Sequence, residues 1–101
     1  MRFPAELEIE VTKEDIAEGV PKESSFCPIA IALTRLISPH DKIVCITVGT
    51  IWIEIKIIKK TGFKTIGYNH SSASKTFTRD FDNKIKVKPA TFRLTKLPNF
   101  R

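Results

Sequence analysis

The chain has 101 residues, which is the length of a single domain, and a formal net charge of +6 at pH 7. Its hydrophobic content of 42% is that of a globular protein and argues against an intrinsically disordered chain. No apolar run approaches the roughly 20 residues of a membrane-spanning helix, and the N-terminus lacks the apolar core of a signal peptide. We therefore expect one domain, residues 1–101, in the cytoplasm.

The charge is divided unevenly along the sequence. Residues 1–26 carry a net charge of −4, whereas residues 27–101 carry +10. A basic body of this kind attracts polyanions in general, without naming one.

The first predicted elements are a strand and a short helix. Residues 6–11 alternate glutamates with Leu7, Ile9 and Val11, which is the pattern of a strand with one buried face. Thr12 and Asp15 have the spacing of a capping box and predict a helix over residues 13–18. Gly19 follows as a helix-terminating glycine.

The chain is organised around a second helix, predicted over residues 28–37. Pro28 suits the first helical position, which makes Cys27 the N-cap residue. Thr34 and Arg35 are the only polar residues in this segment, and a helix that is apolar nearly all round is a buried one. We therefore expect Ile29, Leu33 and Leu36 to lie in the core.

Three strands with two tight turns are predicted next. Residues 42–48 and 51–57 flank Gly49 and Thr50, a pair that suits a two-residue hairpin turn. This turn sets the pairs Val48 with Ile51, Ile46 with Ile53, and Val44 with Ile55. A third strand over residues 64–69 then pairs Ile66 with Ile57 and Tyr68 with Ile55, and Gly67 marks a bulge.

The C-terminal part predicts a helix, an extended segment and a last strand. Ser71 or Ser72 caps a helix that reaches Phe81, and Ala73, Phe77 and Phe81 form its buried stripe. Residues 83–88 are expected to be an extended, lysine-rich segment that discourages sheet-edge aggregation. In the strand over residues 91–95, Arg93 is expected across from the glutamates of the first strand.

The predicted element order is β-α-α-β-β-β-α-β. This order indicates an α+β fold, in which a mostly antiparallel sheet has helices packed on one face. The order of strands in the sheet and the oligomeric state stay open at this point.

Several motifs resemble a set of small uncharacterised proteins from bacteria and their phages. The more specific motif is the run Cys27-Pro28-Ile29-Ala30-x-Ala32-Leu33. The less specific ones are Val11-Thr12-x-Glu14-Asp15-Ile16-x-x-Gly19, Phe77-x-x-Asp80-Phe81-Asp82 and Pro89-x-Thr91-Phe92-x-Leu94. The resemblance implies a bacterial or phage setting, with the host cytoplasm as its location, and transfers no activity or catalytic residue. The lysine-rich residues 57–64 and 84–88 depart from that pattern and suggest a specialised partner.

The sequence contains no recognisable enzyme motif. A Gly-rich phosphate loop, a G-x-S-x-G nucleophile motif and a zinc-binding helix are all lacking. Cys27, Cys45, His40 and His70 do not have the spacing of a zinc site, so we expect no metal and no cofactor. Cys27 at a helix N-terminus is a weaker candidate, as a thiolate nucleophile or redox sensor. No base is identifiable near it, and packing and helix capping by a buried, reduced thiol explain it without either role.

The candidate functional residues are Trp52 and a group of lysines. Trp52 and Lys56 are expected on the sheet face opposite the core, with Lys59, Lys60 and Lys64 around the nearby turn. We expect a small non-enzymatic binding protein that docks on a host protein or nucleoprotein complex, as a defence inhibitor does. The alternative is direct nucleic-acid binding, in which bases stack on Trp52 and the lysines contact phosphates. A terminal segment or a second copy covering Trp52, with lysines that only aid solubility, would explain the same residues without either function.

Overall fold

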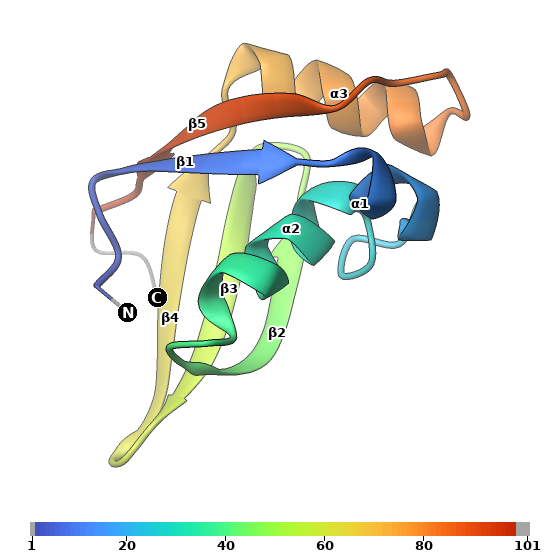
Figure 1. The fold of residues 1–101 in the computed structure, drawn as a ribbon. Coiled ribbons are helices and arrows are strands. Elements are labelled where there is room, and N and C mark those ends of the chain that lie inside the picture. Colours follow the sequence, from blue (N-terminus) through green and yellow to red (C-terminus); the bar gives the residue numbers. More distant parts are fainter. Residues whose placement is uncertain (1, 99–101) are drawn as a thin grey trace.

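The computed structural model describes residues 2–98, which form five strands and three helices in the predicted order (Figure 1). The elements are β1 (Glu6–Val11), α1 (Lys13–Glu18), α2 (Pro28–Ile37), β2 (Lys42–Val48), β3 (Trp52–Lys59), β4 (Gly62–Asn69), α3 (Ser72–Asp82) and β5 (Ala90–Lys96). The α+β class is confirmed, and no helix in residues 2–98 is long and apolar enough to cross a membrane.

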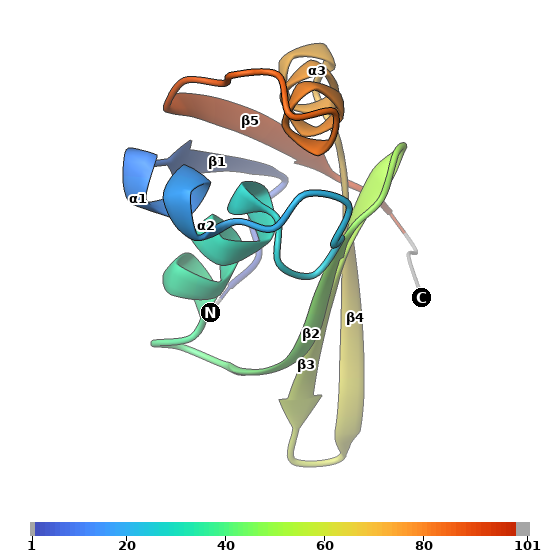
Figure 2. The same ribbon diagram turned by 90° about the vertical axis from the view of Figure 1, so that its right-hand side faces the viewer.

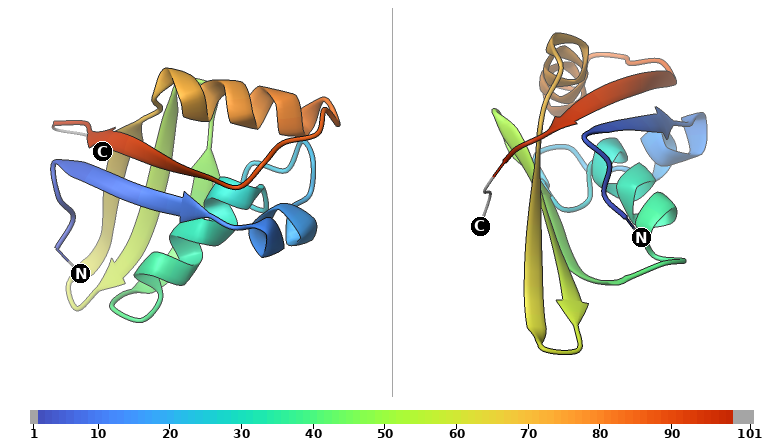
Figure 3. Two further views of the ribbon diagram at one scale, coloured as in Figure 1. Left: turned by 45° about the horizontal axis from the view of Figure 1, so that its top comes forward. Right: turned by 90° about the vertical axis from the view of Figure 1, so that its left-hand side faces the viewer.

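The sheet has the order β1-β5-β4-β3-β2, and all neighbouring strands are antiparallel. Only two residue pairs, Tyr68 with Lys96 and Asn69 with Thr95, join β4 to β5. The sheet curls at this seam, so that the β1–β5 ribbon crosses over one end of the upright β2–β4 strands (Figures 1 and 3). The result is a half-barrel with α2 on its concave side (Figure 2).

Helix α2 fills the concave side, as its apolar sequence predicts. Ile29 and Leu33 are fully buried, and so are Ile53 and Ile55 on the facing surface of β3. Fully burying each of these side chains contributes roughly 1.5–3 kcal/mol. The expectation that the helix is buried all round is wrong at Leu36, which is 37% exposed, because the curled sheet encloses one side of the helix only.

From Cys45 to Ile57 the first hairpin keeps its predicted faces, except at the turn residue Ile51, which is 59% exposed, but it does not keep its predicted register. Val48 pairs with Ile53 and Ile46 pairs with Ile55, because the turn residues are Thr50 and Ile51. The Gly49 N–H donates to the Trp52 carbonyl at 3.0 Å and closes the ladder there. Shifting a turn by one residue moves the pairing by two and leaves every side chain on its own face, so the alternation of apolar residues did not distinguish the two registers.

The predicted position of Val44 on the core face is also wrong. The ladder is irregular between Ile43 and Cys45, which places Ile43 opposite Ile57 and against the core. Val44 is 43% exposed as a consequence. A bulge of this kind inserts one residue into an edge strand and reverses the alternation beyond it.

The second hairpin shows the same kind of shift. Ile66 pairs with Ile55 and Tyr68 with Ile53, because the turn is Lys60–Thr61 and β4 already begins at Gly62. Gly62 has a φ of 133°, a conformation that residues with a side chain rarely adopt. The pairing runs without interruption through Gly67, so the bulge predicted there is not present.

Tyr68 anchors the N-terminal segment across the seam. Its side chain is fully buried, and its hydroxyl donates a hydrogen bond of 2.7 Å to the carbonyl of Pro4. Burial raises the pKa of Tyr68 to about 12, so the hydroxyl keeps its proton and remains a donor at neutral pH.

Helix α3 has the predicted bounds but a different buried stripe. The stripe consists of Ser74, Phe77 and Phe81, whereas Ala73 is exposed. The buried Ser74 hydroxyl is satisfied inside, because it accepts from the Ser71 N–H in the capping box of this helix and lies 2.9 Å from His70 Nδ1. The Phe77 ring packs edge-on against Phe92 of β5, with 5.2 Å between ring centroids.

The segment after α3 is not an extended edge strand. Asn83 ends the helix, and the N–H of Ile85 donates to the Asp80 carbonyl at 2.8 Å. Lys84 adopts a φ of 61°. Residues 83–88 therefore form a turn and a loop that lead into β5, because the helix-terminating hydrogen bonds hold the chain close to α3.

The β1–β5 ribbon follows the prediction. Arg93 lies directly opposite Glu8 in the register, and its guanidinium is 3.8 Å from the Glu8 carboxylate. Both side chains are 66% exposed, so this ion pair contributes about 1 kcal/mol at most.

Candidate partner interface

The outer face of the β2–β4 sheet is the candidate interface. Alternation along β3 directs Ile53, Ile55 and Ile57 into the core and Trp52, Lys56 and Ile58 to the opposite side. The helices lie on the concave side of these three strands, away from this face (Figure 2). The outer face is therefore carried by β3, whose inward side chains lie in the core and hold the strand in place.

Exposed apolar side chains gather at the hairpin end of this face. Phe63 is 66% exposed and Ile58, its partner across the two strands, is 42% exposed. The Lys56 ammonium lies 4.8 Å from the centroid of the Phe63 ring, which is a cation–π contact. We use the name "outer patch" for Lys56, Ile58 and Phe63.

The structure divides the five predicted site residues between two places. Trp52 and Lys56 occupy the outer face as expected, four residues apart on β3, and Trp52 is 48% exposed. Lys59, Lys60 and Lys64 surround the hairpin tip, also as expected.

The three tip lysines do not share one surface. Lys60 is in the turn, and Lys64 faces the concave side because it pairs with core-facing Ile57. Lys59 also faces the concave side, where its ammonium lies 3.3 Å from the Asp41 carboxylate. Lys56 is therefore the predicted lysine that lies on the outer face, and Lys60 lies in the turn at the hairpin tip.

Two residues of the outer patch were missed by the sequence reasoning. The predicted third strand begins at residue 64, after Phe63, and the predicted surface residues do not include Ile58. The available signal was Gly62, because a glycine can adopt the φ of 133° that is found at the start of β4, directly after the turn. Once β4 begins at Gly62, alternation places Phe63 on the outer face.

His70 forms a buried polar site that the sequence reasoning did not identify. Its Nε2 lies 2.8 Å from the Gly49 carbonyl and its Nδ1 lies 2.9 Å from the Ser74 hydroxyl. Burial lowers the pKa of His70, although the hydrogen bond to Gly49 opposes this effect. Because a carbonyl only accepts, Nε2 carries the proton of the neutral ring.

The His70–Ser74 pair has the composition of a nucleophile and its base, but its geometry is that of a structural clamp. Ser74 is fully buried, and its hydroxyl already bonds to Ser71 as well as to His70. His70 thereby ties the start of α3 to the turn between β2 and β3.

Cys27 does not have the environment of a reactive thiol. It is 3% exposed, and its sulfur lies 3.9 Å from the Ser24 carbonyl. Burial raises the pKa of Cys27 and outweighs the lowering by the amide groups of the helix N-terminus. Cys45, by contrast, is exposed on the sheet.

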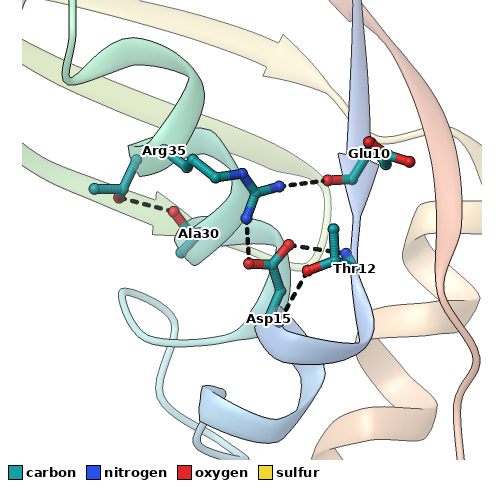
Figure 4. A network of polar contacts seen from close by, with 6 residues as sticks. Glu10, Thr12, Asp15, Ala30 and Arg35 are labelled. Atoms are coloured by element: carbon teal, nitrogen blue, oxygen red, sulfur yellow. Dashed lines mark hydrogen bonds and ion pairs between the residues drawn. The ribbon is translucent and has the colours of Figure 1, made fainter.

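A polar network on the other side of the molecule connects three elements (Figure 4). The Arg35 guanidinium of α2 donates to the buried carboxylate of Asp15 in α1 and, at 2.9 Å, to the Glu10 carbonyl in β1. The second Asp15 oxygen accepts from the Thr12 N–H at 2.9 Å. Burial alone would raise the pKa of Asp15, but the hydrogen bonds from Arg35 and Thr12 outweigh it and lower that pKa.

Within residues 2–98, no three His, Cys, Asp or Glu side chains come close enough together to hold a metal ion. Comparison of the chain with protein-family models, with curated proteins and with solved structures finds no match.

Proposed function

We propose that the chain is a non-enzymatic binding protein that docks through the outer patch and the hairpin tip on a partner with an acidic surface. The observation that carries this proposal is the exposure of Phe63 and Ile58 side by side with Lys56 on the outer face of the sheet. Exposed apolar residues that gather beside cations are typical of an interaction site.

The outer patch has the parts that a protein interface needs. A large aromatic residue such as Phe63 supplies roughly 1.5–3 kcal/mol when a partner buries it. Lys56 and Lys60 add orientation and a faster encounter with an acidic surface, rather than much affinity. The tip of the β3–β4 hairpin extends beyond the body of the fold (Figure 2), so the residues near the tip can enter a recess on a partner.

The resemblance described above supports a phage or mobile-element origin and a host protein or nucleoprotein complex as the partner. In that setting, inhibition of a host defence complex is one function that needs no catalytic group. The protein would act in the host cytoplasm.

The second candidate function is direct binding of single-stranded nucleic acid. It is favoured by the aromatic rings of Phe63 and Trp52 with Lys56 on one strand surface, since bases stack on such rings and lysines neutralise phosphates. Filter binding of single- and double-stranded oligonucleotides tests this function. Affinity for single strands that falls steeply with salt would favour it, and no retention at low salt would reject it.

The docking proposal is tested by affinity capture from a bacterial host, comparing wild-type protein with Phe63→Ser. The matched control is Phe26→Ser, because Phe26 is 61% exposed but lies by α2, on the other side of the sheet. A partner held by the wild type and the control and lost by Phe63→Ser supports the proposal. Equal capture by all three proteins, each with an unchanged melting temperature, would reject this surface.

A further inference from the structure

The outer edge of β1 has open backbone groups. The N–H of Lys96 donates to the Ala5 carbonyl at 2.7 Å, so the backbone groups of Ala5, Leu7 and Ile9 face β5. By the same alternation, those of Glu6, Glu8 and Glu10 face away from β5. The bond from Arg35 to the Glu10 carbonyl agrees with this direction, and within residues 2–98 it is the only one that closes this edge.

This edge borders a groove of about 530 Å³ between β1 and α2. It is lined by Glu8, Ile9 and Glu10 of β1, by Thr91 of β5, which pairs with Glu10, and by Ala32, Arg35 and Leu36 of α2. Leu36 is the residue that was expected in the core and is 37% exposed. The groove thus combines unpaired backbone donors and acceptors with an apolar side chain.

We propose that this groove binds an extended partner segment in which basic and apolar residues alternate, added to the sheet beside β1. An added strand takes its affinity from backbone hydrogen bonds with the edge and its specificity from alternate side chains. Apolar residues of the segment turn inward toward Leu36. The basic residues lie on the outer face, opposite Glu6, Glu8 and Glu10, where cross-strand pairs of opposite charge are favourable.

The other edge of the sheet is protected against such an addition. Strand β2 has a bulge at Val44, and its Val48 N–H is already bonded to the Ser24 carbonyl at 2.9 Å. Bulges and covering loops are the usual means of closing an edge strand. Strand β1 has no bulge in its pairing with β5, and within residues 2–98 helix α2 bonds to its open edge at Glu10 alone. Its outward side chains are glutamates, whose charge repels an acidic segment and attracts a basic one.

The test measures fluorescence anisotropy of a labelled, end-blocked peptide of alternating lysine and valine with the full-length protein. We expect saturable binding at low salt. A second peptide is N-methylated at alternate residues, so that its edge facing β1 has no N–H donors. This change should weaken binding about tenfold, because two hydrogen bonds to β1 are lost. A peptide with glutamate in place of lysine should not bind.

Protein variants separate the contribution of the backbone from that of charge. Glu8→Pro removes an N–H that faces the groove and is tolerated at a sheet edge, whereas Glu8→Gln removes only the charge. We expect Glu8→Pro to weaken binding more than Glu8→Gln, with circular dichroism confirming that both variants fold.

Three results would overturn the proposal. The first is equal binding of the N-methylated and unmethylated peptides, which would mean that charge attraction alone causes binding. The second is no binding of the lysine–valine peptide at low salt. The third is self-association of the protein through this edge without peptide binding. Because the outer patch is on a different surface, Phe63→Ser should leave peptide binding unchanged, and the two proposals therefore fail independently.

Discussion

The Asp15–Arg35 pair provides the sharpest test of how the helices are held to the sheet. Asp15 is 2% exposed and Arg35 is 51% exposed, so the carboxylate depends on this partner while the guanidinium retains contact with water. In Asp15→Asn, the side-chain amide can satisfy either Arg35 or the Thr12 N–H with its oxygen, and its NH2 group then opposes the other donor. A hydrogen bond between charged groups contributes about 1.5–3 kcal/mol, and solvent screening at Arg35 favours the lower end.

We therefore expect Asp15→Asn to lower the free energy of unfolding by about 2 kcal/mol, which corresponds to about 10 °C in melting temperature. The assay is urea unfolding at neutral pH in a double-mutant cycle with Arg35→Met, which keeps the apolar stem of the side chain. A coupling energy below about 0.5 kcal/mol would refute the assigned role of the pair.

The pH dependence of the same variant gives an independent check. Because the pKa of Asp15 is lowered from 3.8 by folding, its contribution is fully present above that value and is lost as the pH falls through the folded-state pKa. The difference in stability between wild type and Asp15→Asn should accordingly disappear in strong acid. A difference that persists there would mean that shape, and not charge, is responsible.

Three further predictions concern His70, Gly19 and Gly62. Burial lowers the pKa of His70 below 6.5, so its contribution to stability is present above pH 6.5 and is lost as the pH falls below that value. The free energy of unfolding of the wild type should therefore drop more between neutral pH and pH 5 than that of His70→Gln. Equal drops in the two proteins would contradict this reasoning. Gly19→Ala should lower the free energy of unfolding by about 1–3 kcal/mol through overpacking, because the added Cβ would lie 2.7 Å from Pro28 Cδ. Gly62→Ala should lower it by about 1–2 kcal/mol through backbone strain, because Gly62 has a φ of 133° and an added Cβ would meet only open space. In chemical denaturation, a variant as stable as the wild type would refute the cause assigned to it.

Local patterns in the sequence were sufficient to predict the elements. The Thr12–Asp15 capping box, Pro28 at the start of α2 and the Ser71 cap of α3 all act within a few residues, and each begins a helix at the predicted position. Strict alternation in β1 likewise placed Glu8 opposite Arg93 once the two strands were paired.

What the sequence did not reveal depends on distant parts of the chain. Gly19 ends α1 in an extended conformation with φ −67°, and not in the left-handed one typical of such a glycine. A glycine is needed there because Pro28 and Phe81 leave no room for a side chain. Leu36 is exposed because of the curl of the whole sheet, which α2 itself does not determine.

The candidate site was predictable only in part, for a related reason. Trp52 and Lys56 followed from alternation within one strand. Phe63 and Ile58 become neighbours only when the turn is placed at Lys60–Thr61, and apolar alternation accepts more than one such placement. Whether the predicted residues contact a partner remains the proposal stated above.

The position of β1 in the sheet has a consequence for how the protein is made. Among the described residues 2–98, β1 pairs with β5 alone in the sheet, so Glu6 can form its backbone pairing only after Thr95 has been synthesised. During synthesis the N-terminal strand leaves the ribosome long before its mate, while the β2–β4 meander assembles from adjacent segments. Closing such a distant pair costs chain entropy, so the ribbon should form late, and a released chain truncated before residue 90 should bind chaperones more readily than the full-length chain.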